Sequence, residues 1–227
     1  MPAVEPVLSL AGRTQNPVLP AVPCRIGGFG GASGMAAYLQ RESIEMVIDA
    51  THPFAENISA NAEAACRETG VRLVVFTRPP WKPEKGDRWT EVPDAASAAA
   101  AIGAEPRRVF LTVGRLQLPA FEAAPQHDYL IRTIDPPNPP PNLPSYRLIM
   151  ARGPFTLIDE LQLLRSEGMR VLVTKNSGGN AARAKIDAAR VLKMDVILMR
   201  QPSRGAVRAL HNLDAVVAAI QEKPRGV

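Results

Sequence analysis

The sequence predicts an α/β protein made of two Rossmann-like parallel-sheet domains with an interdomain cleft. Short unbroken apolar runs, typical of parallel strands buried on both faces, alternate with helical patterns along the chain. Hydrophobic residues make up 46% of the 227 residues, which is enough for a sizeable core. The pattern predicts about eight strands, more than one small doubly wound sheet needs. We therefore expect two domains of similar build, residues 1–104 and 105–227.

In the first half of the chain, continuous apolar runs predict three strands, at residues 7–11, 45–50 and 71–77. Helical periodicity predicts three helices, at residues 33–42, 55–69 and 94–102. Ser33 or the glycines before it would cap the first helix, and Asp94 would cap the third. Gly70 would end the second, since glycine readily adopts the left-handed conformation of a helix stop.

The second half continues the alternation. Five strands are expected, at residues 109–113, 129–133, 147–151, 170–174 and 195–199. Three helices are expected, at residues 155–167, 180–192 and 213–222. The first of these is amphipathic, with Leu157, Leu161 and Leu164 on one face. Prolines cluster at 79–83 and 136–144, which predicts loops there.

The charge balance points to a soluble protein with no nucleic-acid motif. The net charge is +5, from 27 basic and 22 acidic residues that form no long single-sign block. This pattern fits either ordinary solubility or a basic cleft for a polyanionic ligand. Cys24 and Cys66 do not form a close pair, so we expect reduced thiols. With no signal-peptide pattern at the start and no membrane-spanning run, we expect a cytoplasmic location and no membrane partner.

Candidate functional residues follow the predicted strands, because ligands of open parallel sheets bind beyond the carboxyl ends of the strands. The stretches concerned are "AGRT" (11–14), "GGFGG" (27–31), "THPFA" (51–55), "RPPW" (78–81), "GR" (114–115), "ARGPF" (151–155) and "KNSGG" (175–179).

Three of these stretches suggest anion binding, each with a plainer alternative. "KNSGG" joins a strand to a helix, so Lys175 and the glycine turn form either an anion pocket or a tight turn with a solvated lysine. It lacks the spacing of a phosphate-binding P-loop. "GGFGG" is either a cofactor loop or a flexible connection. Arg13 with Thr14 suits the 2′-phosphate of NADP, or Arg13 is an ordinary surface residue.

His52 lies just past a strand, before a proline and at a helix entrance. The positive end of a helix dipole disfavours imidazolium, so we expect a neutral ring. Such a ring donates a hydrogen bond, relays a proton or only shapes the turn. His127 and His211 show no metal-ligand spacing with it, so no metal site is predicted. Serine-protease, nucleophile-elbow and HExxH patterns are absent from the sequence.

Taken together, these stretches resemble the precorrin-6A reductase family of cobalamin biosynthesis. The matching stretches occur in family order from residue 9 to about residue 200. They are "SLAGRT", "RIGGFGG" followed by "GMAAYL", "VIDATHPFA", "ISANAEAAC", "RPPW" with "GDRW", "VFLTVGR", "ARGPF" and "VTKNSGG".

The resemblance implies transfer of a hydride from NADPH, with uptake of a proton, to one double bond of precorrin-6A or its cobalt form, giving precorrin-6B. It implies that residues 1–104 bind the cofactor, that residues 105–227 bind the substrate, and that the active site lies between the domains. It also allows a handover of this polycarboxylated tetrapyrrole between neighbouring cobalamin-pathway enzymes. The alternatives are a non-catalytic tetrapyrrole-binding protein and an unrelated α/β enzyme that binds a phosphate or nucleotide.

On this resemblance the candidate residues take three roles. His52 and Lys175 are the catalytic candidates, as groups that position the nicotinamide or donate the proton. The cofactor-binding candidates are Arg13, Thr14, Gly28, Gly30, Gly31 and Thr51. The substrate-binding candidates are Arg78, Arg115, Arg152, Ser177, Gly178 and Gly179, since arginine forks bind carboxylates in bidentate fashion.

The start of the chain departs from the family pattern. Members usually begin with a strand and a Gly-Gly-Thr-x-Glu-Ala type turn that leads into a first helix. This chain begins at what we interpret as the second strand, so we expect that the first strand and helix are missing. We therefore expect poor NADPH binding, a rearranged N-terminal domain or edge pairing with another chain.

Overall fold

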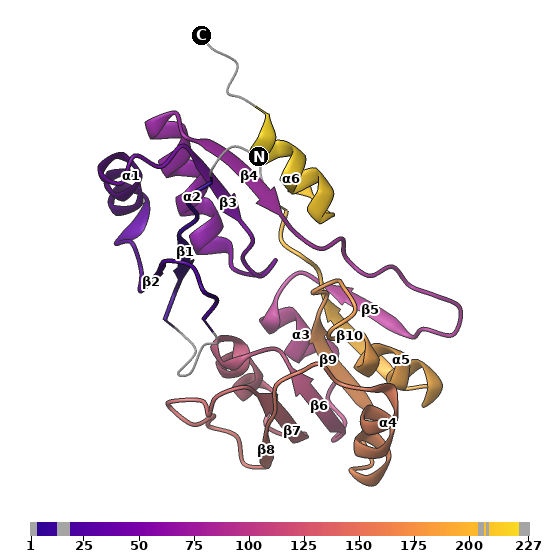
Figure 1. Ribbon diagram of the computed structural model, residues 1–227. Coiled ribbons are helices and arrows are strands. Elements are labelled where there is room, and N and C mark those ends of the chain that lie inside the picture. Colours follow the sequence, from indigo (N-terminus) through magenta and orange to yellow (C-terminus); the bar gives the residue numbers. More distant parts are fainter. Residues whose placement is uncertain (1–3, 13–18, 204–206, 208, 223–227) are drawn as a thin grey trace. The chain divides into compact units, whose positions relative to one another are not determined.

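The computed structural model describes residues 4–12, 19–203, 207 and 209–222, and the chain divides into two compact units (Figure 1). Unit 1 comprises Met1–Arg78 with Ser203–Val227, and unit 2 comprises Pro79–Pro202. Strands in both units pair in parallel and are joined by helices, which confirms the predicted α/β class. Within the described ranges, no helix is long and apolar enough to cross a membrane.

Unit 1 holds two small parallel sheets among its described residues, ordered β1-β2 and β11-β4-β3. Its strands are β1 (Leu8–Leu10), β2 (Cys24–Ile26), β3 (Met46–Asp49), β4 (Arg72–Phe76) and β11 (Ala209–Leu210). Its helices are α1 (Gly31–Arg41), α2 (Glu56–Thr69) and α6 (Leu213–Gln221).

Helices α1 and α2 of unit 1 pack against each other around a small apolar cluster. Met35 and Leu39 of α1 and Ala65 and Cys66 of α2 are buried there, with Leu73 of β4 packed against them. Burial raises the pKa of the Cys66 thiol to about 11, as fits a thiol packed in this cluster. Helix α6 covers the other face of β4, because Arg72, which precedes Leu73, donates to the Ala219 carbonyl of α6 (2.8 Å).

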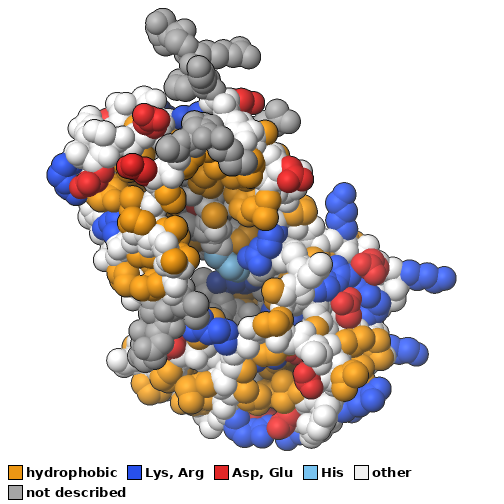
Figure 2. Space-filling model, in the orientation of Figure 1, with side chains coloured by type: hydrophobic (Ala, Val, Ile, Leu, Met, Phe, Trp, Pro, Cys, Tyr) orange, Lys and Arg blue, Asp and Glu red, His pale blue; other side chains and the backbone are white. Residues whose placement is uncertain are grey.

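The two sheets of unit 1 have strand edges that no other described strand pairs with. In the part of the chain that the structure describes, β1 pairs only with β2, and β3 pairs with β4 on one side only. Ile26 at the end of β2 is 55% exposed and Ile48 of β3 is 39% exposed. Figure 2 shows hydrophobic side chains at the surface over this unit. Whether these edges pair with another chain stays a prediction.

Unit 2 is built on a six-stranded parallel sheet in the order β5-β10-β9-β6-β7-β8. The strands are β5 (Trp89–Val92), β6 (Arg108–Thr112), β7 (Asp128–Thr133), β8 (Tyr146–Met150), β9 (Val171–Lys175) and β10 (Asp195–Met199). The helices are α3 (Ala95–Ala101), the 3-10 helix η1 (Arg115–Ala123), α4 (Leu157–Ser166) and α5 (Ala184–Val191).

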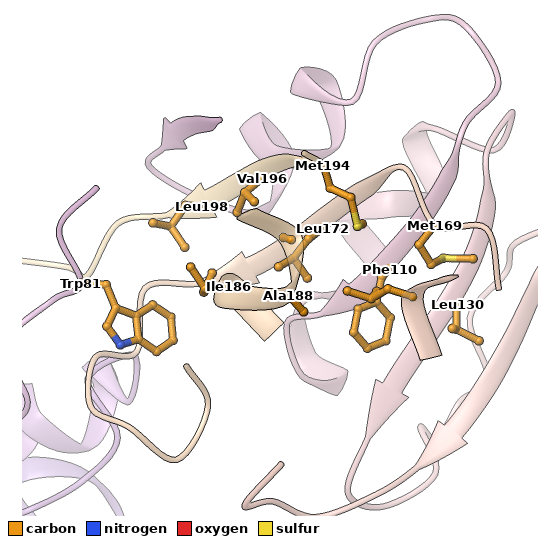
Figure 3. Packing of buried hydrophobic residues seen from close by; sticks show 12 residues of the cluster. Trp81, Phe110, Leu130, Met169, Leu172, Ile186, Ala188, Met194, Val196 and Leu198 are labelled. Carbon is orange, nitrogen blue, oxygen red and sulfur yellow. The ribbon is translucent and has the colours of Figure 1, made fainter. Parts of the chain in front are cut away.

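The main core of unit 2 lies between this sheet and helices α4 and α5 (Figure 3). Phe110, Leu172 and Leu198 project from three strands onto Leu164 of α4 and Ile186 of α5. All five side chains are at most 1% exposed. Burying each such side chain is worth about 1.5–3 kcal/mol, so this layer is a principal source of unit 2's stability.

Several helix ends follow the predicted signals. Asp94 caps α3 by accepting a hydrogen bond from the Ser97 N–H (2.7 Å). Gly70 ends α2 in the left-handed conformation (φ 73°). For α1 the cap is Gly30 (φ 83°), so the glycine alternative to Ser33 is confirmed. Thr156, which the sequence reading did not single out, caps α4 through the Asp159 N–H (3.2 Å).

Four short elements were not predicted, namely β2, β5, β11 and η1. Strands β2 and β11 span three and two residues, too few to show a period. Strand β5 is an edge strand, and its middle residues Thr90 and Glu91 are exposed and polar. The 3-10 helix contains Pro119, and a proline within a segment predicts a loop rather than a helix.

The predicted division between residues 104 and 105 does not coincide with the two units. Strand β5 pairs with β10, which places the segment before α3 in unit 2. Strand β11 pairs with β4, which returns the end of the chain to unit 1. The sequence argument assumed that each domain is one continuous stretch of chain. Apolar periodicity is a local pattern, so it does not indicate which distant strands pair with each other.

A buried ion pair joins the sheet of unit 2 to α4. Arg132 of β7 donates to Glu160 of α4 at 2.5 Å, and their side chains are 7% and 1% exposed. The Arg132 guanidinium also lies 3.8 Å from the ring centre of Phe155 and 4.8 Å from that of Phe110. The pair is therefore removed from water on all sides, and each charge depends on the other.

Glu160→Ala should destabilise the protein strongly, because it leaves the Arg132 charge buried without its carboxylate. We expect the free energy of unfolding to fall by about 3–5 kcal/mol. Glu63→Ala is the matched control, because it breaks the exposed Arg67–Glu63 pair and should cost about 0.5 kcal/mol or less. Urea unfolding followed by circular dichroism measures both. Equal small losses would contradict the role given to the buried pair.

Candidate active site

The first group of candidate residues lies at the carboxyl edge of the β11-β4-β3 sheet in unit 1. These strands are parallel, so the residues that follow β3 and β4 meet at one edge. Thr51 and His52 follow β3, and Thr77 and Arg78 follow β4. With Ala50, Pro53 and Phe76, they line a cavity of about 260 Å³. Thr51, His52 and Arg78, predicted for three different roles, are thus brought together.

Asp49, at the end of β3, holds the turn that carries Thr51 and His52. Its side chain is buried and accepts from the Thr51 N–H at 3.0 Å and from the Thr51 hydroxyl at 2.6 Å. Its second oxygen accepts from the Ser59 hydroxyl of α2, also at 2.6 Å. One carboxylate therefore ties the strand end, the turn and the helix start together.

The turn also defines which ring nitrogen of His52 carries hydrogen. The Phe54 N–H donates to His52 Nδ1 at 3.2 Å. An N–H group can only donate, so Nδ1 acts as an acceptor and the hydrogen of the neutral ring is on Nε2. That the ring is neutral stays a prediction.

Thr77 and His211 complete this edge of the sheet. His211 Nδ1 lies 2.8 Å from the Thr77 carbonyl oxygen, which only accepts, so Nδ1 donates. Through this bond β11 fixes the backbone next to Arg78. The Thr77 hydroxyl oxygen is buried and has no hydrogen-bond partner among the described residues. It is therefore a polar atom with unused capacity in a residue that lines the cavity.

The predicted glycine loop joins β2 to α1. Gly30 and Gly31 have positive φ values of 83° and 89°, which glycine adopts without strain. Arg25 holds the loop, donating at 3.0 Å to the carbonyl oxygens of Gly27 and Gly28. Its guanidinium lies 3.8 Å from the ring centre of Phe29. The result is an ordered turn at a helix N-terminus, where backbone N–H groups favour anions.

The 2′-phosphate prediction for Arg13 and Thr14 lies outside the described residues. Gly12, just before them, has a positive φ of 72° and lies close to Ile26 of β2.

In unit 2 the candidates follow β9 and β6, which are neighbours in the sheet. Lys175 is the last residue of β9, and Arg115 is the first residue of η1 after β6. A Cβ atom at Gly114 would lie 3.8 Å from Lys175 Nζ, so the lysine reaches over the adjacent strand end. The structure thus brings two predicted cations to neighbouring strand ends.

The "KNSGG" loop after β9 is held by residues that sequence reasoning did not assign. The Asn176 side chain accepts from the Trp81 N–H (2.7 Å) and donates to the Trp81 carbonyl (3.0 Å). The Trp81 indole donates to the Gly179 carbonyl at 2.8 Å. Ser177 and Gly178 lie between these contacts and are buried. Two predicted stretches, "RPPW" and "KNSGG", are therefore locked together.

Arg152 follows β8, two strands away from β6, and is exposed. The next residue, Gly153, lies near the loop beyond "KNSGG", since a Cβ there would be 3.5 Å from the Ala181 carbonyl oxygen. The Arg152 loop is thus close to the loop after β9, although no contact of Arg152 itself with the other candidates is seen among the described residues.

Outside these candidates, the described residues show no metal-binding group, and the basic residues near α5 are paired with acids. In the part of the chain that the structure describes, no group of three or more His, Cys, Asp or Glu residues is placed to hold a metal ion.

Arg183 and Arg190 of the α5 region pair with Glu84, Asp87 and Asp187. Figure 2 shows basic side chains beside acidic ones on this flank. These cations are neutralised, unlike a cluster open to a polyanion.

The family described as "Precorrin-6x reductase CbiJ/CobK" matches residues 2–221 of the sequence. The chain belongs to this family. Its members act as reductases, so the family implies an oxidoreductase with a hydride donor, and the resemblance seen in the sequence is confirmed.

Individual members of the CbiJ/CobK family are close relatives. The chain is 51% identical over 226 residues to "Precorrin-6A reductase" of Rhodobacter capsulatus, covering 98% of this chain and 90% of that one. It is 42% identical to the Mycobacterium tuberculosis enzyme of the same name, covering 98% and 91%. A solved structure, "CobK precorrin-6A reductase", superposes with a TM-score of 0.90 at 51% identity, covering 97% of this chain and 89% of that one.

Lys185 is a further residue of this CbiJ/CobK chain that sequence reasoning missed. It lies in the first turn of α5, is buried, and is near Arg132, Glu160 and Lys175. Burial, with smaller effects from these charges, lowers the pKa of Lys185 to about 7 from an ordinary 10.5. Its helical position looked like any amphipathic surface lysine, so no local signal marked it.

Lys185→Met should flatten the pH dependence of stability between pH 7 and 10.5. In this window the unfolded chain holds a proton on Lys185 that the folded chain has lost, so the wild type gains stability as the pH rises. The gain is up to about 1.4 kcal/mol per pH unit. Urea unfolding at several pH values measures the slope.

Lys82→Met is the matched control, since Lys82 is exposed and should leave the slope unchanged. If wild type and Lys185→Met show the same slope across this window, the pKa of Lys185 is not lowered, and water reaches its ammonium group more than its burial indicates.

Proposed function

We propose that this chain catalyses the NADPH-dependent reduction of one double bond of precorrin-6A to give precorrin-6B. The observation that carries the proposal is the 51% identity with the Rhodobacter capsulatus precorrin-6A reductase across 98% of this chain and 90% of that one. The stretches that contain the candidate residues fall within this match.

The metal-free precorrin is the substrate favoured by the comparison. Relatives named precorrin-6A reductase are 42–51% identical to this chain. Relatives named cobalt-precorrin-6A reductase, from Priestia megaterium, Methanothermobacter thermautotrophicus and Synechocystis, are 27–30% identical. This difference in sequence identity is expected if the residues that bind the substrate differ between enzymes for the metal-free and the cobalt-containing precorrin.

Unit 1 has residues suited to NADPH. The Gly28–Gly31 turn and the N-terminus of α1 offer backbone N–H groups for a phosphate. The cavity lined by Thr51, His52 and Arg78 offers hydroxyl, imidazole and guanidinium groups. Arg13 and Thr14 would add the 2′-phosphate contact expected from the sequence. These groups suit NADPH: the glycine turn would bind the pyrophosphate, and Arg13 with Thr14 would bind the 2′-phosphate.

Unit 2 has residues suited to a macrocycle that carries many carboxylates. Arg115 and Lys175 stand at neighbouring strand ends, and Ser177 with its two following glycines forms the clamped loop beside them. Arginine and lysine bind carboxylates through charge-assisted hydrogen bonds. Arg152 would contribute from the loop after β8.

The chemistry divides between cofactor and protein. When bound, NADPH supplies the hydride, and the protein's own task is to orient the reactants and to deliver one proton. His52 carries hydrogen on Nε2 in the cavity, and Lys175 stands at the strand end; either of these side chains, or solvent, would supply the proton. The reaction requires no metal ligand from the protein.

The reaction itself is the direct test. We expect the purified chain, mixed with NADPH and precorrin-6A, to oxidise NADPH with stoichiometric formation of precorrin-6B, measured by absorbance and mass spectrometry. Lys175→Met should weaken turnover because it removes a cation from the substrate loop. Binding of the tetrapyrrole without NADPH oxidation would instead identify a non-catalytic holding protein.

Arg13→Ala should weaken NADPH far more than NADH, since only NADPH carries the 2′-phosphate. A lost charge-assisted contact is worth about 1.5–3 kcal/mol, so we expect the dissociation constant for NADPH to rise roughly 10- to 100-fold. Isothermal titration with both cofactors measures the ratio. An equal effect on the two would show that Arg13 does not bind the phosphate.

A further inference from the structure

The hydroxyl group of Thr51 has a defined direction. The Asp49 carboxylate accepts from the Thr51 hydroxyl and from the Ser59 hydroxyl, each at 2.6 Å. In both bonds the hydroxyl is the donor and the carboxylate oxygen is the acceptor, so each hydroxyl group gives its single hydrogen to Asp49. The Thr51 and Ser59 oxygens, 3.3 Å apart, then have no hydrogen left to share. What the Thr51 oxygen retains is acceptor capacity.

This acceptor belongs to a residue that lines the unit 1 cavity. The buried Asp49 carboxylate accepts one bond from the Thr51 hydroxyl and another from the Thr51 backbone N–H, so it holds both the side chain and the turn that carries it. A hydroxyl whose only hydrogen is already donated favours a ligand N–H donor and disfavours a second acceptor.

We propose that the Thr51 hydroxyl, oriented by Asp49, accepts a hydrogen bond from the primary carboxamide N–H of the nicotinamide ring. This inference rests on the proposed NADPH dependence and assigns the cavity to the reacting end of the cofactor. Thr51 is thereby a specificity-determining residue for the amide, and Asp49 is the residue that positions it.

The test compares two ligands, NADP⁺ and its 3-acetylpyridine analogue, which keeps the carbonyl oxygen but replaces the amide NH₂ by a methyl group. Thr51→Val removes the acceptor while preserving the branched shape. We expect the dissociation constant of NADP⁺ to rise about tenfold, the value of one ordinary hydrogen bond, and that of the analogue to change less than about twofold. Isothermal titration or ligand-detected NMR reads these constants without turnover.

Two variants make the pattern specific. Thr51→Ser keeps the hydroxyl and should keep the preference for NADP⁺ over the analogue. His52→Ala should weaken both ligands by the same factor, because both carry the same ring and carbonyl. A general disturbance of the cavity weakens both ligands, as expected for His52→Ala, whereas a loss of amide recognition weakens NADP⁺ alone. Circular dichroism checks that each variant is folded.

Equal weakening of both ligands by Thr51→Val would overturn the amide assignment and leave NADPH dependence standing; it would place another part of the dinucleotide at Thr51. Loss of the preference for NADP⁺ in Thr51→Ser would also overturn it. Absence of saturable NADP⁺ binding to the wild type would overturn the proposed cofactor itself, and the carboxamide assignment with it.

Discussion

Parallel strand pairing is the constraint on which the functional features of this chain depend. In a parallel sheet the carboxyl ends of successive strands lie at one edge, so residues far apart in the sequence meet there. Thr51 and Arg78 reach the same cavity because β3 and β4 are paired in register. Lys175 and Arg115 come together because β9 and β6 are neighbours. Buried residues in the middle of these strands, such as Phe110 and Leu172, serve packing instead.

A second level of organisation comes from polar side chains that bind backbone groups. Arg25 holds the glycine loop, Asp49 holds the turn after β3, and Asn176 holds the loop after β9. In each case the group binds its target by two or more hydrogen bonds, which fixes orientation as well as distance. These residues affect ligand binding without touching the ligand, because a loop that is already ordered loses less conformational entropy when the ligand binds.

The α/β class, the six helices and the helix ends at Asp94 and Gly70 could be predicted from the sequence, because they depend on local periodicity and local capping. The positions of Thr51 and His52 at a strand end followed from the same logic. The pairings of β5 with β10 and of β11 with β4 could not, since they join distant segments that are short or polar. Asp49 and Asn176 escaped notice because their partners are known only once the turns are folded.

The chain enters unit 2 after Arg78 and returns at Ser203, so unit 2 is an insertion into unit 1. A ribosome completes the inserted segment before it reaches β11, whereas His211 and Thr77, bonded in the folded unit, are 134 positions apart. Domains fold as units while synthesis proceeds. Every strand described in unit 2 is therefore synthesised before β11, the strand that pairs with β4. The unit that contains the first residue of the chain is therefore also the unit whose last strand and helix are synthesised later.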